Sequence, residues 1–268
     1  MILPAEIQQK AREAGVRDTQ MEKDYILSWI LQGIASHKRL STSLVFKGGT
    51  VLKKFYFEDY RFSEDLDFTL NAQEQTNEQI FEWFHEVFEY IREEANIPLE
   101  LTDDNEHEDG GINFYISYTG PLGGKGKQKS VKVDISRSEL LCFDSETRSA
   151  IGLYSDQEDF DLLCYSLDEV LIEKMRSVMQ RMQPRDFYDI WYLLEIVQMD
   201  LEFLLPEFSK KCEHKELRSS DFEDALLRRL PLYQARWTGS ISDQIQELPE
   251  FEQVEREVQR HFRIVDFT

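Results

Sequence analysis

Residues 45–70 read VFKGGTVLKKFYFEDYRFSEDLDFTL. It contains an apolar run, two glycines and a second apolar run that carries Asp65 and Asp67. Alternate residues of a strand face the same way, so both carboxylates project from one face while Leu66 and Phe68 point into the core. Like charges this close repel each other unless a cation lies between them. The stretch therefore predicts a strand that binds a metal ion; the alternative is a pair of solvent-facing acids on an edge strand.

The segment SVKVDIS, residues 130–136, predicts a second strand with an acid on its polar face. Apolar residues alternate with Lys132 and Asp134, which therefore share one side. If this strand lies beside the first, three carboxylates converge, as in phosphoryl-transfer enzymes that hold two metal ions. Since Mg²⁺ takes one or two carboxylates together with substrate phosphates, we expect Asp65, Asp67 and Asp134 to bind Mg²⁺ (or Mn²⁺). Asp134 would also help to deprotonate an attacking hydroxyl; the alternative is that it is a lone exposed acid.

The turn Lys47-Gly48-Gly49 predicts a phosphate site. It joins a short expected strand to an expected helix whose N-cap lies near Thr50. A glycine turn that opens a helix directs backbone N–H groups toward a phosphate, although such turns also occur for geometric reasons alone. The turn is not a P-loop, because the chain has no GxxxxGK[ST] motif. We expect Ser63 to add a hydroxyl to the same phosphate.

The hydrophobic periodicity predicts an α+β fold in which strands give way to helices along the chain. The expected strands are residues 44–46, 65–70, 112–118 and 130–136, and the expected helices are 21–36, 77–95, 166–182, 186–198, 200–213, 219–230 and 249–262. We therefore divide the chain into an α/β domain, residues 1–160, and a helical domain, residues 161–268. An acidic run, DDNEHEDGG (103–111), is interpreted as a solvated loop, and the lysine-rich loop 120–132 as a solvated hairpin or a phosphate contact.

The composition narrows the class of protein. A net charge of −21, from 31 basic and 52 acidic side chains, disfavours an indiscriminate nucleic-acid coat but not a local contact to RNA or a nucleotide. The three cysteines (Cys142, Cys164 and Cys212) lie far apart, which suits buried thiols in a reducing cytosol. No run of apolar residues is long enough to span a membrane, and the N-terminus does not read as a secretory signal. These features indicate a cytoplasmic protein.

The motifs KGGT, RFSEDLDF and VKVDIS together resemble the AbiEii/AbiGii toxin family. Its members are polymerase-β-like nucleotidyltransferases found as toxins of bacterial toxin–antitoxin and phage-defence systems. EKDYILSWIL (22–31) is similar to the segment that precedes the glycine turn in that family, and EKMRSVMQRMQPRDFYDIWYLL (173–194) resembles its other block. The resemblance implies a polymerase-β-like core, a mixed sheet flanked by helices, followed by a helical domain that completes the active-site cleft. The resemblance does not extend to residues 200–268.

The resemblance implies roles for single residues. The resemblance implies that the turn, a nearby hydroxyl and a distant lysine bind the nucleotide, namely Lys47, Gly48, Gly49, Thr50, Ser63 and Lys174. Catalytic roles fall on four acids and the same lysine, namely Asp65, Asp67, Asp134, Asp186 and Lys174. Polymerase-β-like enzymes often have Gly-Ser at the turn where this chain has Gly49-Thr50, and threonine keeps the hydroxyl. The place of Asp134 as third acid depends on the strand pattern rather than on a firm family match.

Lys174 and Asp186 also have structural interpretations. Lys174 lies at the border of an apolar helical stripe, where a lysine is more often a snorkelling surface residue. Asp186 falls in the first turn of the next helix, where an acid favours the helix dipole whatever its function. Arg185 is expected to pair with Asp186 or with Asp189, one turn further along.

The expected function is an Mg²⁺-dependent transfer of a nucleoside monophosphate from an NTP to an acceptor hydroxyl. The resemblance suggests a toxin with RNA, in particular a tRNA 3′ end, as acceptor and a cognate antitoxin protein as partner. The alternatives are a catalytically silent module that binds a nucleotide or a partner protein, and a metal-dependent phosphohydrolase that uses the same acids.

Overall fold

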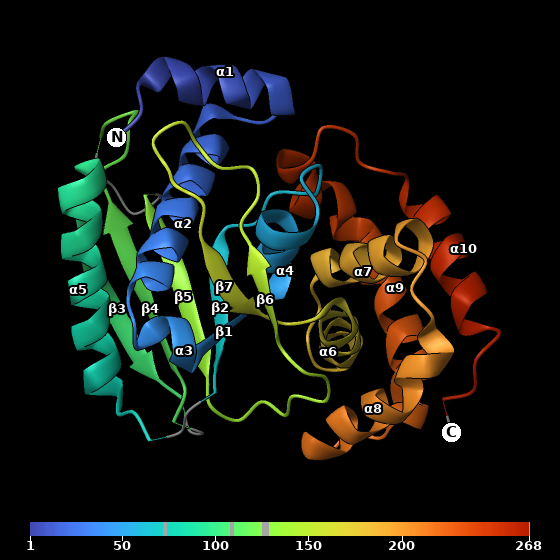
Figure 1. Cartoon of the computed structure of the whole chain (residues 1–268). Helices are drawn as coiled ribbons and strands as arrows, with labels where there is room; N and C mark the ends of the chain where they lie inside the picture. The colour runs from blue at the N-terminus through green and yellow to red at the C-terminus, as the bar shows by residue number, and fades with distance from the viewer. Residues whose placement is uncertain (72–73, 108–109, 125–128, 268) are drawn as a thin grey trace. The chain divides into compact units, whose positions relative to one another are not determined.

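The computed structural model describes residues 1–71, 74–107, 110–124 and 129–267 (Figure 1). The chain forms two compact units. The first, Met1–Glu139 with Ser145–Cys164, is called the sheet unit, and the second, Leu140–Asp144 with Tyr165–Thr268, is called the helical unit. The chain therefore crosses between the units after Glu139, after Asp144 and after Cys164. Part of the lysine-rich loop, residues 125–128, lies outside the described residues.

The sheet unit is built on a seven-stranded mixed sheet of order β3-β4-β5-β2-β1-β7-β6. Its strands are β1 (Leu44–Lys47), β2 (Asp65–Leu70), β3 (Leu99–Glu106), β4 (Ile112–Tyr118), β5 (Ser130–Ser136), β6 (Glu146–Ser149) and β7 (Asp161–Cys164). The pairs β2–β5 and β1–β7 are parallel, and the other neighbours are antiparallel. The central strands β2 and β5 are therefore paired on both edges, and their side chains alternate between an apolar and a polar face.

Two long helices cover the apolar face of β4 and its neighbours (Figure 1): α2 (Asp18–Ser36) and α5 (Asn77–Ala95). A capping box formed by Thr76 and Gln79 starts α5. The ring of Phe114 on β4 lies 5.4 and 5.0 Å from the rings of Phe81 and Phe84 on α5. Burial of this face leaves the opposite side of β4, β5 and β2 for polar residues. The shorter helices α1 (Pro4–Ala14), α3 (Leu40–Ser43) and α4 (Gly48–Val51) complete the unit with a π-helical turn, Leu52–Tyr56.

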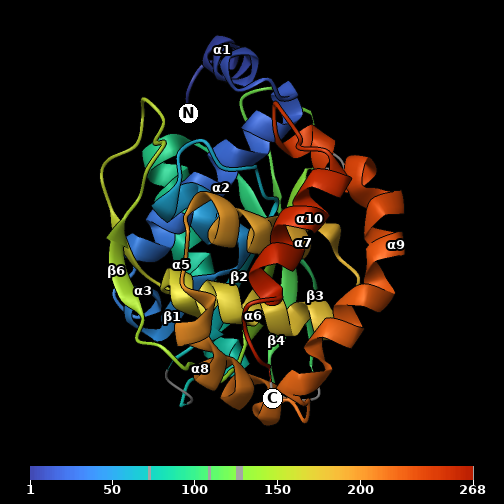
Figure 2. The same cartoon turned by 90° about the vertical axis from the view of Figure 1, so that its right-hand side faces the viewer.

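The helical unit packs around α6 (Figure 2). Its main helices are α6 (Leu167–Gln180), α7 (Pro184–Trp191), α8 (Leu201–His214), α9 (Phe222–Ile241) and α10 (Phe251–Phe262), and a π-helical turn, Tyr192–Ile196, extends α7. Helix α6 contacts α7, α8 and α9. The buried ring of Phe187 on α7 stacks on Tyr233 at 5.6 Å and contacts Trp237 and Phe251. An aromatic cluster therefore joins α7, α9 and α10.

Three local expectations were wrong. The acidic run at 103–111 begins inside β3, where exposed acids and a register shift between Thr102 and Asn105 hide the strand pattern. Helix α9 was expected to end at residue 230, but it continues through Pro231 to Ile241, because residues beyond the proline, such as Trp237, are buried in the core. The helix after the glycine turn starts at Gly48, so Thr50 lies inside its first turn and is not an N-cap.

Within the described part of the chain, no helix is both long and apolar enough to cross a membrane. Cys164 and Cys212 are buried free thiols, as expected, whereas Cys142 is only half-buried. Burial raises the pKa of the Cys142 thiol to about 11, and it also raises the pKa of Cys164.

Candidate active site

The predicted acids of the sheet unit lie on one face of adjacent strands. In the parallel β2–β5 pair Asp67 lies directly opposite Asp134, and in the antiparallel β1–β2 pair Lys47 lies directly opposite Asp67. Directly opposed residues project to the same side of a sheet, and neighbouring strands lie about 4.8 Å apart. Lys47, Asp67 and Asp134 therefore form a row across the sheet, and Asp65, two residues from Asp67, lies on the same face opposite Lys132.

Asp134 has a basic residue on its own strand and, beside it, a histidine that directly follows β3. Lys132 Nζ lies 3.4 Å and His107 Nε2 3.7 Å from the Asp134 carboxylate, which is 27% exposed. The side chain of Asn113, whose backbone pairs with Asp134, lies 3.1 Å from His107 Nε2. His107 was not predicted from the sequence, because its run was interpreted as a loop and only the strand register brings it here.

The backbone of the glycine turn lies against the Asp67 carboxylate. Gly48 has φ +80°, and a Cβ atom at this position would lie 2.3 Å from Asp67 Oδ2. Any larger residue would have to adopt the left-handed conformation and displace this carboxylate. The glycine is therefore required by both geometry and space, and the turn sets the position of Asp67.

Gly49 lies over two buried polar side chains. A Cβ atom at Gly49 would lie 2.7 Å from Arg61 Nη2 and 3.4 Å from Ser63 Oγ. Arg61 is 2% exposed and donates to the carbonyl of Phe62 at 3.2 Å, so its charge lies directly beneath the turn. The Thr50 hydroxyl donates to the backbone carbonyl of Asp65 at 2.5 Å and fastens the turn to β2. This arrangement supplies positive charge where the sequence predicted a phosphate.

The donor set suits a hard divalent cation. In the described part of the chain, no three His, Cys, Asp or Glu side chains are grouped to hold a metal ion. However, Asp67 and Asp134 present carboxylate oxygens from the same face of adjacent strands, with Asp65 beside them. Mg²⁺ needs only one or two protein carboxylates when substrate phosphates complete its octahedron. The residues present therefore fit Mg²⁺ bound together with a nucleotide.

The helical unit contains a second cluster, built on Lys174. Its ammonium group lies 2.8 Å from Asp186 Oδ1 and 2.7 Å from Asp189 Oδ2, and the lysine is 6% exposed overall. The alternative of a snorkelling surface lysine is therefore wrong. Arg181 donates to both oxygens of Asp186 at 2.7 and 2.9 Å, in the place expected of Arg185. Arg181 was missed because the helix was expected to run to residue 182, whereas α6 ends at Gln180 and Arg181 lies in the break before α7.

The charges of this cluster determine how Asp186 titrates. Burial by itself would raise the pKa of Asp186, but the opposing charges of Lys174 and Arg181 outweigh it and hold the pKa below its usual value. Asp186 therefore remains ionised at neutral pH and fixes both basic groups. The alternative role of Asp186, favouring the dipole of α7, does not account for these ion pairs.

A mixed sheet with a glycine turn, a row of acids on adjacent strands and a helical unit defines the fold of a nucleotidyltransferase. JHP933 from Helicobacter pylori has the same fold at a TM-score of 0.58, with 15% identity over 93% of this chain and 92% of that one. MenT4, a nucleotidyltransferase toxin from Mycobacterium tuberculosis, aligns at a TM-score of 0.50, with 19% identity over 99% of both chains. No curated protein sequence matches at a significant level.

The model of the AbiEii nucleotidyltransferase toxins of type IV toxin–antitoxin systems matches residues 29–259. The chain therefore belongs to this family and is a nucleotidyltransferase. The predicted α+β nucleotidyltransferase fold and the predicted family are both confirmed.

Proposed function

We propose that the protein transfers a nucleoside monophosphate from an NTP to a hydroxyl at an RNA 3′ end, with tRNA as the first acceptor to test. The observation that carries this proposal is the row formed by Lys47, Asp67 and Asp134 beside Gly48. It joins carboxylates to a turn with buried positive charge, which suits a triphosphate. The reaction would take place in the cytoplasm and act as the toxic step of a toxin–antitoxin or phage-defence system, countered by an antitoxin protein.

In this proposal the turn binds the triphosphate. The backbone N–H groups of Gly48 and Gly49 and the hydroxyl of Ser63 face the phosphates, and Arg61 adds charge from below. Asp65, Asp67 and Asp134 would hold Mg²⁺ (or Mn²⁺), which when bound neutralises charge on the phosphate oxygens. Thr50 acts indirectly, since its hydroxyl already binds the Asp65 carbonyl.

The chemical step is an in-line displacement at the α-phosphorus. The acceptor oxygen forms a bond to this phosphorus, the bond to the bridging oxygen breaks, and pyrophosphate leaves. Asp134 accepts the proton of the acceptor hydroxyl. In keeping with the family resemblance, the proposal assigns Lys174, held by Asp186, to the nucleotide phosphates.

The test is incubation of the protein with each α-labelled NTP, Mg²⁺ and total RNA, followed by separation of the labelled RNA. We expect transfer from at least one NTP and a loss of at least about a hundredfold in Asp65→Ala. The matched control, Asp159→Ala, removes an exposed carboxylate outside the row and should have no effect. Absence of transfer by the wild type, or equal transfer by Asp65→Ala, would sink the proposal. Nucleotide binding without turnover would indicate a silent module, and release of free phosphate without labelled RNA a phosphohydrolase.

A further inference from the structure

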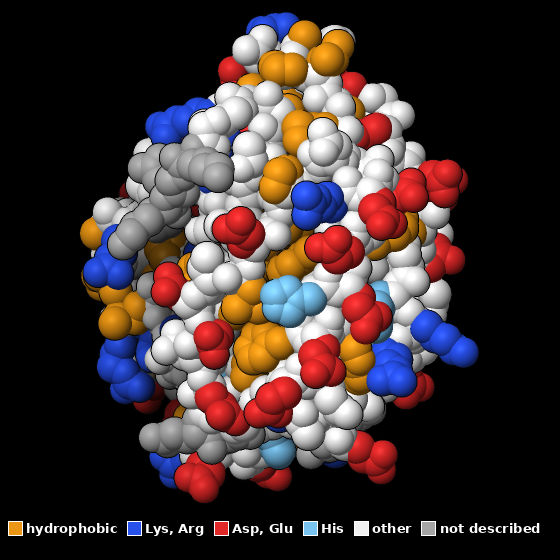
Figure 3. All heavy atoms as spheres, turned by 90° about the vertical axis from the view of Figure 1, so that its left-hand side faces the viewer, with side chains coloured by type: hydrophobic (Ala, Val, Ile, Leu, Met, Phe, Trp, Pro, Cys, Tyr) orange, Lys and Arg blue, Asp and Glu red, His pale blue; other side chains and the backbone are white. Residues whose placement is uncertain are grey.

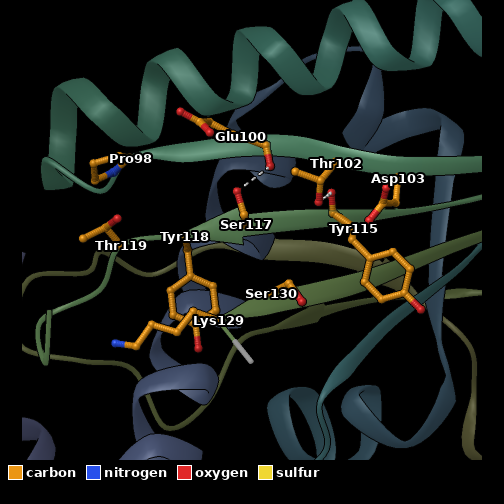
Figure 4. A pocket seen from close by; sticks show the side chains of 10 residues that line it. All are labelled: Pro98, Glu100, Thr102, Asp103, Tyr115, Ser117, Tyr118, Thr119, Lys129 and Ser130. Atoms are coloured by element: carbon orange, nitrogen blue, oxygen red, sulfur yellow. Dashed lines mark hydrogen bonds between the residues drawn. The ribbon is translucent and has the colours of Figure 1, made fainter. Parts of the chain in front are cut away.

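A pocket of about 470 Å³ opens on the sheet unit beside the acid row. Its lining comes from β3, β4, β5 and their connections (Figure 4). Tyr115 and Asp103 lie at one end, and Pro98, Thr119 and Lys129 lie at the other. None of the roles assigned in the proposed function uses these residues. A volume of this size suits one nucleoside or sugar unit rather than a duplex.

The strand register places this pocket on the same face as the predicted acids. Thr102 of β3 lies opposite Tyr115 of β4, Tyr115 lies opposite Lys132 of β5, and Lys132 lies opposite Asp65 of β2. Tyr115 is therefore two strand spacings, about 10 Å, from Asp65 on one continuous polar surface. A nucleoside whose base lies over Tyr115 is long enough for its 3′ hydroxyl to reach the acid row, formed by Asp65, Asp67 and Asp134.

The side of approach follows from the chemistry of the proposed reaction. In an in-line displacement the attacking and leaving oxygens lie on opposite sides of the α-phosphorus. The glycine turn at the end of β1 would hold the leaving pyrophosphate, on one side of Asp67. The attacking hydroxyl must then arrive from the other side, where β5, β4 and β3 follow in order. The pocket lies on that side.

The lining groups suit a ribonucleoside. The half-buried ring of Tyr115 offers a surface on which a base can stack. The exposed carboxylates of Glu100 and Asp103, on the side of the pocket away from the acid row, can accept hydrogen bonds from the amino groups of a base, while the 3′ hydroxyl extends toward the acid row. Lys129 is already bound by the buried Glu22 at 2.8 Å, so it adds little charge for a row of phosphates.

The face of the sheet unit that carries α5 is less suitable for an RNA end. The face of the sheet unit on which α5 lies carries many acidic side chains (Figure 3). Such a surface repels a polyanion. We propose that the pocket lined by Thr102, Tyr115 and Ser117 is the acceptor subsite and binds the terminal ribonucleoside of a single-stranded RNA end. This inference rests on the proposed function and assigns the place and the residues that select the acceptor.

The first test measures binding without catalysis. A 5′-fluorescein-labelled single-stranded RNA hexamer with a free 3′ hydroxyl is titrated with the full chain in the absence of NTP, and anisotropy is recorded. We expect Tyr115→Ala to weaken binding about tenfold, as expected for the loss of one stacked base. Ser117→Phe, which places a ring inside the pocket, should weaken binding at least as much. The matched control is Tyr90→Ala on α5, which should bind as the wild type does.

A second measurement separates this subsite from the nucleotide site. In the transfer assay, Tyr115→Ala and Ser117→Phe should raise the KM for the RNA about tenfold and leave the KM for the NTP unchanged. A hexamer whose 3′-terminal nucleotide lacks its base should bind the wild type several times more weakly than the intact hexamer, because it cannot stack on Tyr115. Thermal melting by circular dichroism verifies that each variant is folded.

The outcomes distinguish the two proposals. If the hexamer does not bind the wild type, or binds both variants as well as the wild type, the subsite is overturned. If RNA labelling proceeds with an unchanged KM for RNA in both variants, the subsite fails while the proposed function stands. If the variants lose binding but no NTP is ever transferred to RNA, the subsite stands and the proposed function fails.

Discussion

Gly48 determines both the conformation of the glycine turn and the position of the Asp67 carboxylate. Its φ of +80° and the 2.3 Å separation between its added Cβ and Asp67 Oδ2 leave no room for a side chain. In the proposed mechanism, phosphate binding and the placement of Asp67 therefore depend on one residue. The same stretch of sequence that predicted the turn did not reveal this contact, because it arises only when β1 and β2 pair.

Gly48→Ala should lower the rate of nucleotide transfer at least tenfold. The left-handed conformation costs alanine about 1 kcal/mol, and the new methyl group also displaces the Asp67 carboxylate. Initial rates at saturating NTP and RNA measure the effect. The control is Gly152→Ala, which has φ +64° but no atom within 4 Å of the added Cβ. Equal losses in both variants would show that backbone strain, and not the displaced carboxylate, is responsible.

Asp186→Asn should destabilise the protein by about 3–5 kcal/mol at pH 7, because it leaves buried Lys174 without part of its counter-charge. The folded pKa of Asp186 lies below its ordinary value of 3.8, so its stabilisation is present above that pH and is lost as pH falls through the folded pKa. The difference in unfolding free energy between wild type and variant should therefore shrink below about pH 4. Urea unfolding from pH 7 to pH 3 measures it.

The control for that experiment is Asp221→Asn, which removes an exposed partner of Arg218 in the same unit. It should cost less than about 1 kcal/mol at pH 7. A difference between wild type and Asp186→Asn that stays constant down to pH 3 would contradict the ionised state assigned to Asp186.

At the scale of elements, α6 and α8 hold a segment that returns from the sheet unit. Glu169 on α6 accepts hydrogen bonds from the backbone N–H groups of Cys142 and Phe143, each at 2.9 Å. Lys211 on α8 pairs with Glu169 and donates to the carbonyl of Leu140 at 2.8 Å. Both charged side chains are buried, so this ion pair fixes Leu140–Asp144 to the helical unit.

Glu169→Ala should lower the free energy of unfolding by about 3–5 kcal/mol, because it leaves Lys211 buried without its counter-charge. Hydrogen exchange at the Cys142 and Phe143 amides should accelerate more than exchange elsewhere in the unit. Urea unfolding and exchange mass spectrometry measure the two effects. Glu207→Ala, which removes an exposed i,i+3 pair with Lys210, is the control and should change stability by less than about 0.5 kcal/mol. A uniform acceleration of exchange would contradict the local role.

Strands were predicted correctly from the sequence where apolar and polar residues alternate strictly. The strands at 112–118 and 130–136 were predicted with the bounds observed, because apolar and polar residues alternate through both. It failed at β3, whose exposed acids and bulge remove that alternation. The acid row could be predicted because each strand presents its own acid, whereas His107 and Arg181 required the register and the packing of elements distant in sequence.

At the scale of the whole molecule, the net charge of −21 should limit how RNA is bound. The proposed acceptor subsite takes one nucleoside and, on a protein of this charge, would make few phosphate contacts. The slope of log affinity against log salt for the RNA hexamer should therefore be shallower than about −3. Anisotropy titrations from low to physiological salt measure it. A steep slope, near −6, would show that a row of cations binds the phosphate backbone instead.

The chain passes between the sheet unit and the helical unit three times, after Glu139, Asp144 and Cys164, and this has a consequence for the gene. Neither unit is encoded by one uninterrupted stretch, because five codons of the helical unit lie within the stretch that encodes the sheet unit. A stop codon or a recombination junction near residue 160 would separate Leu140–Asp144 from the Glu169 and Lys211 that hold it. We expect the two halves to be inherited together, so that new specificities arise by substitution within the chain rather than by exchange of modules between genes.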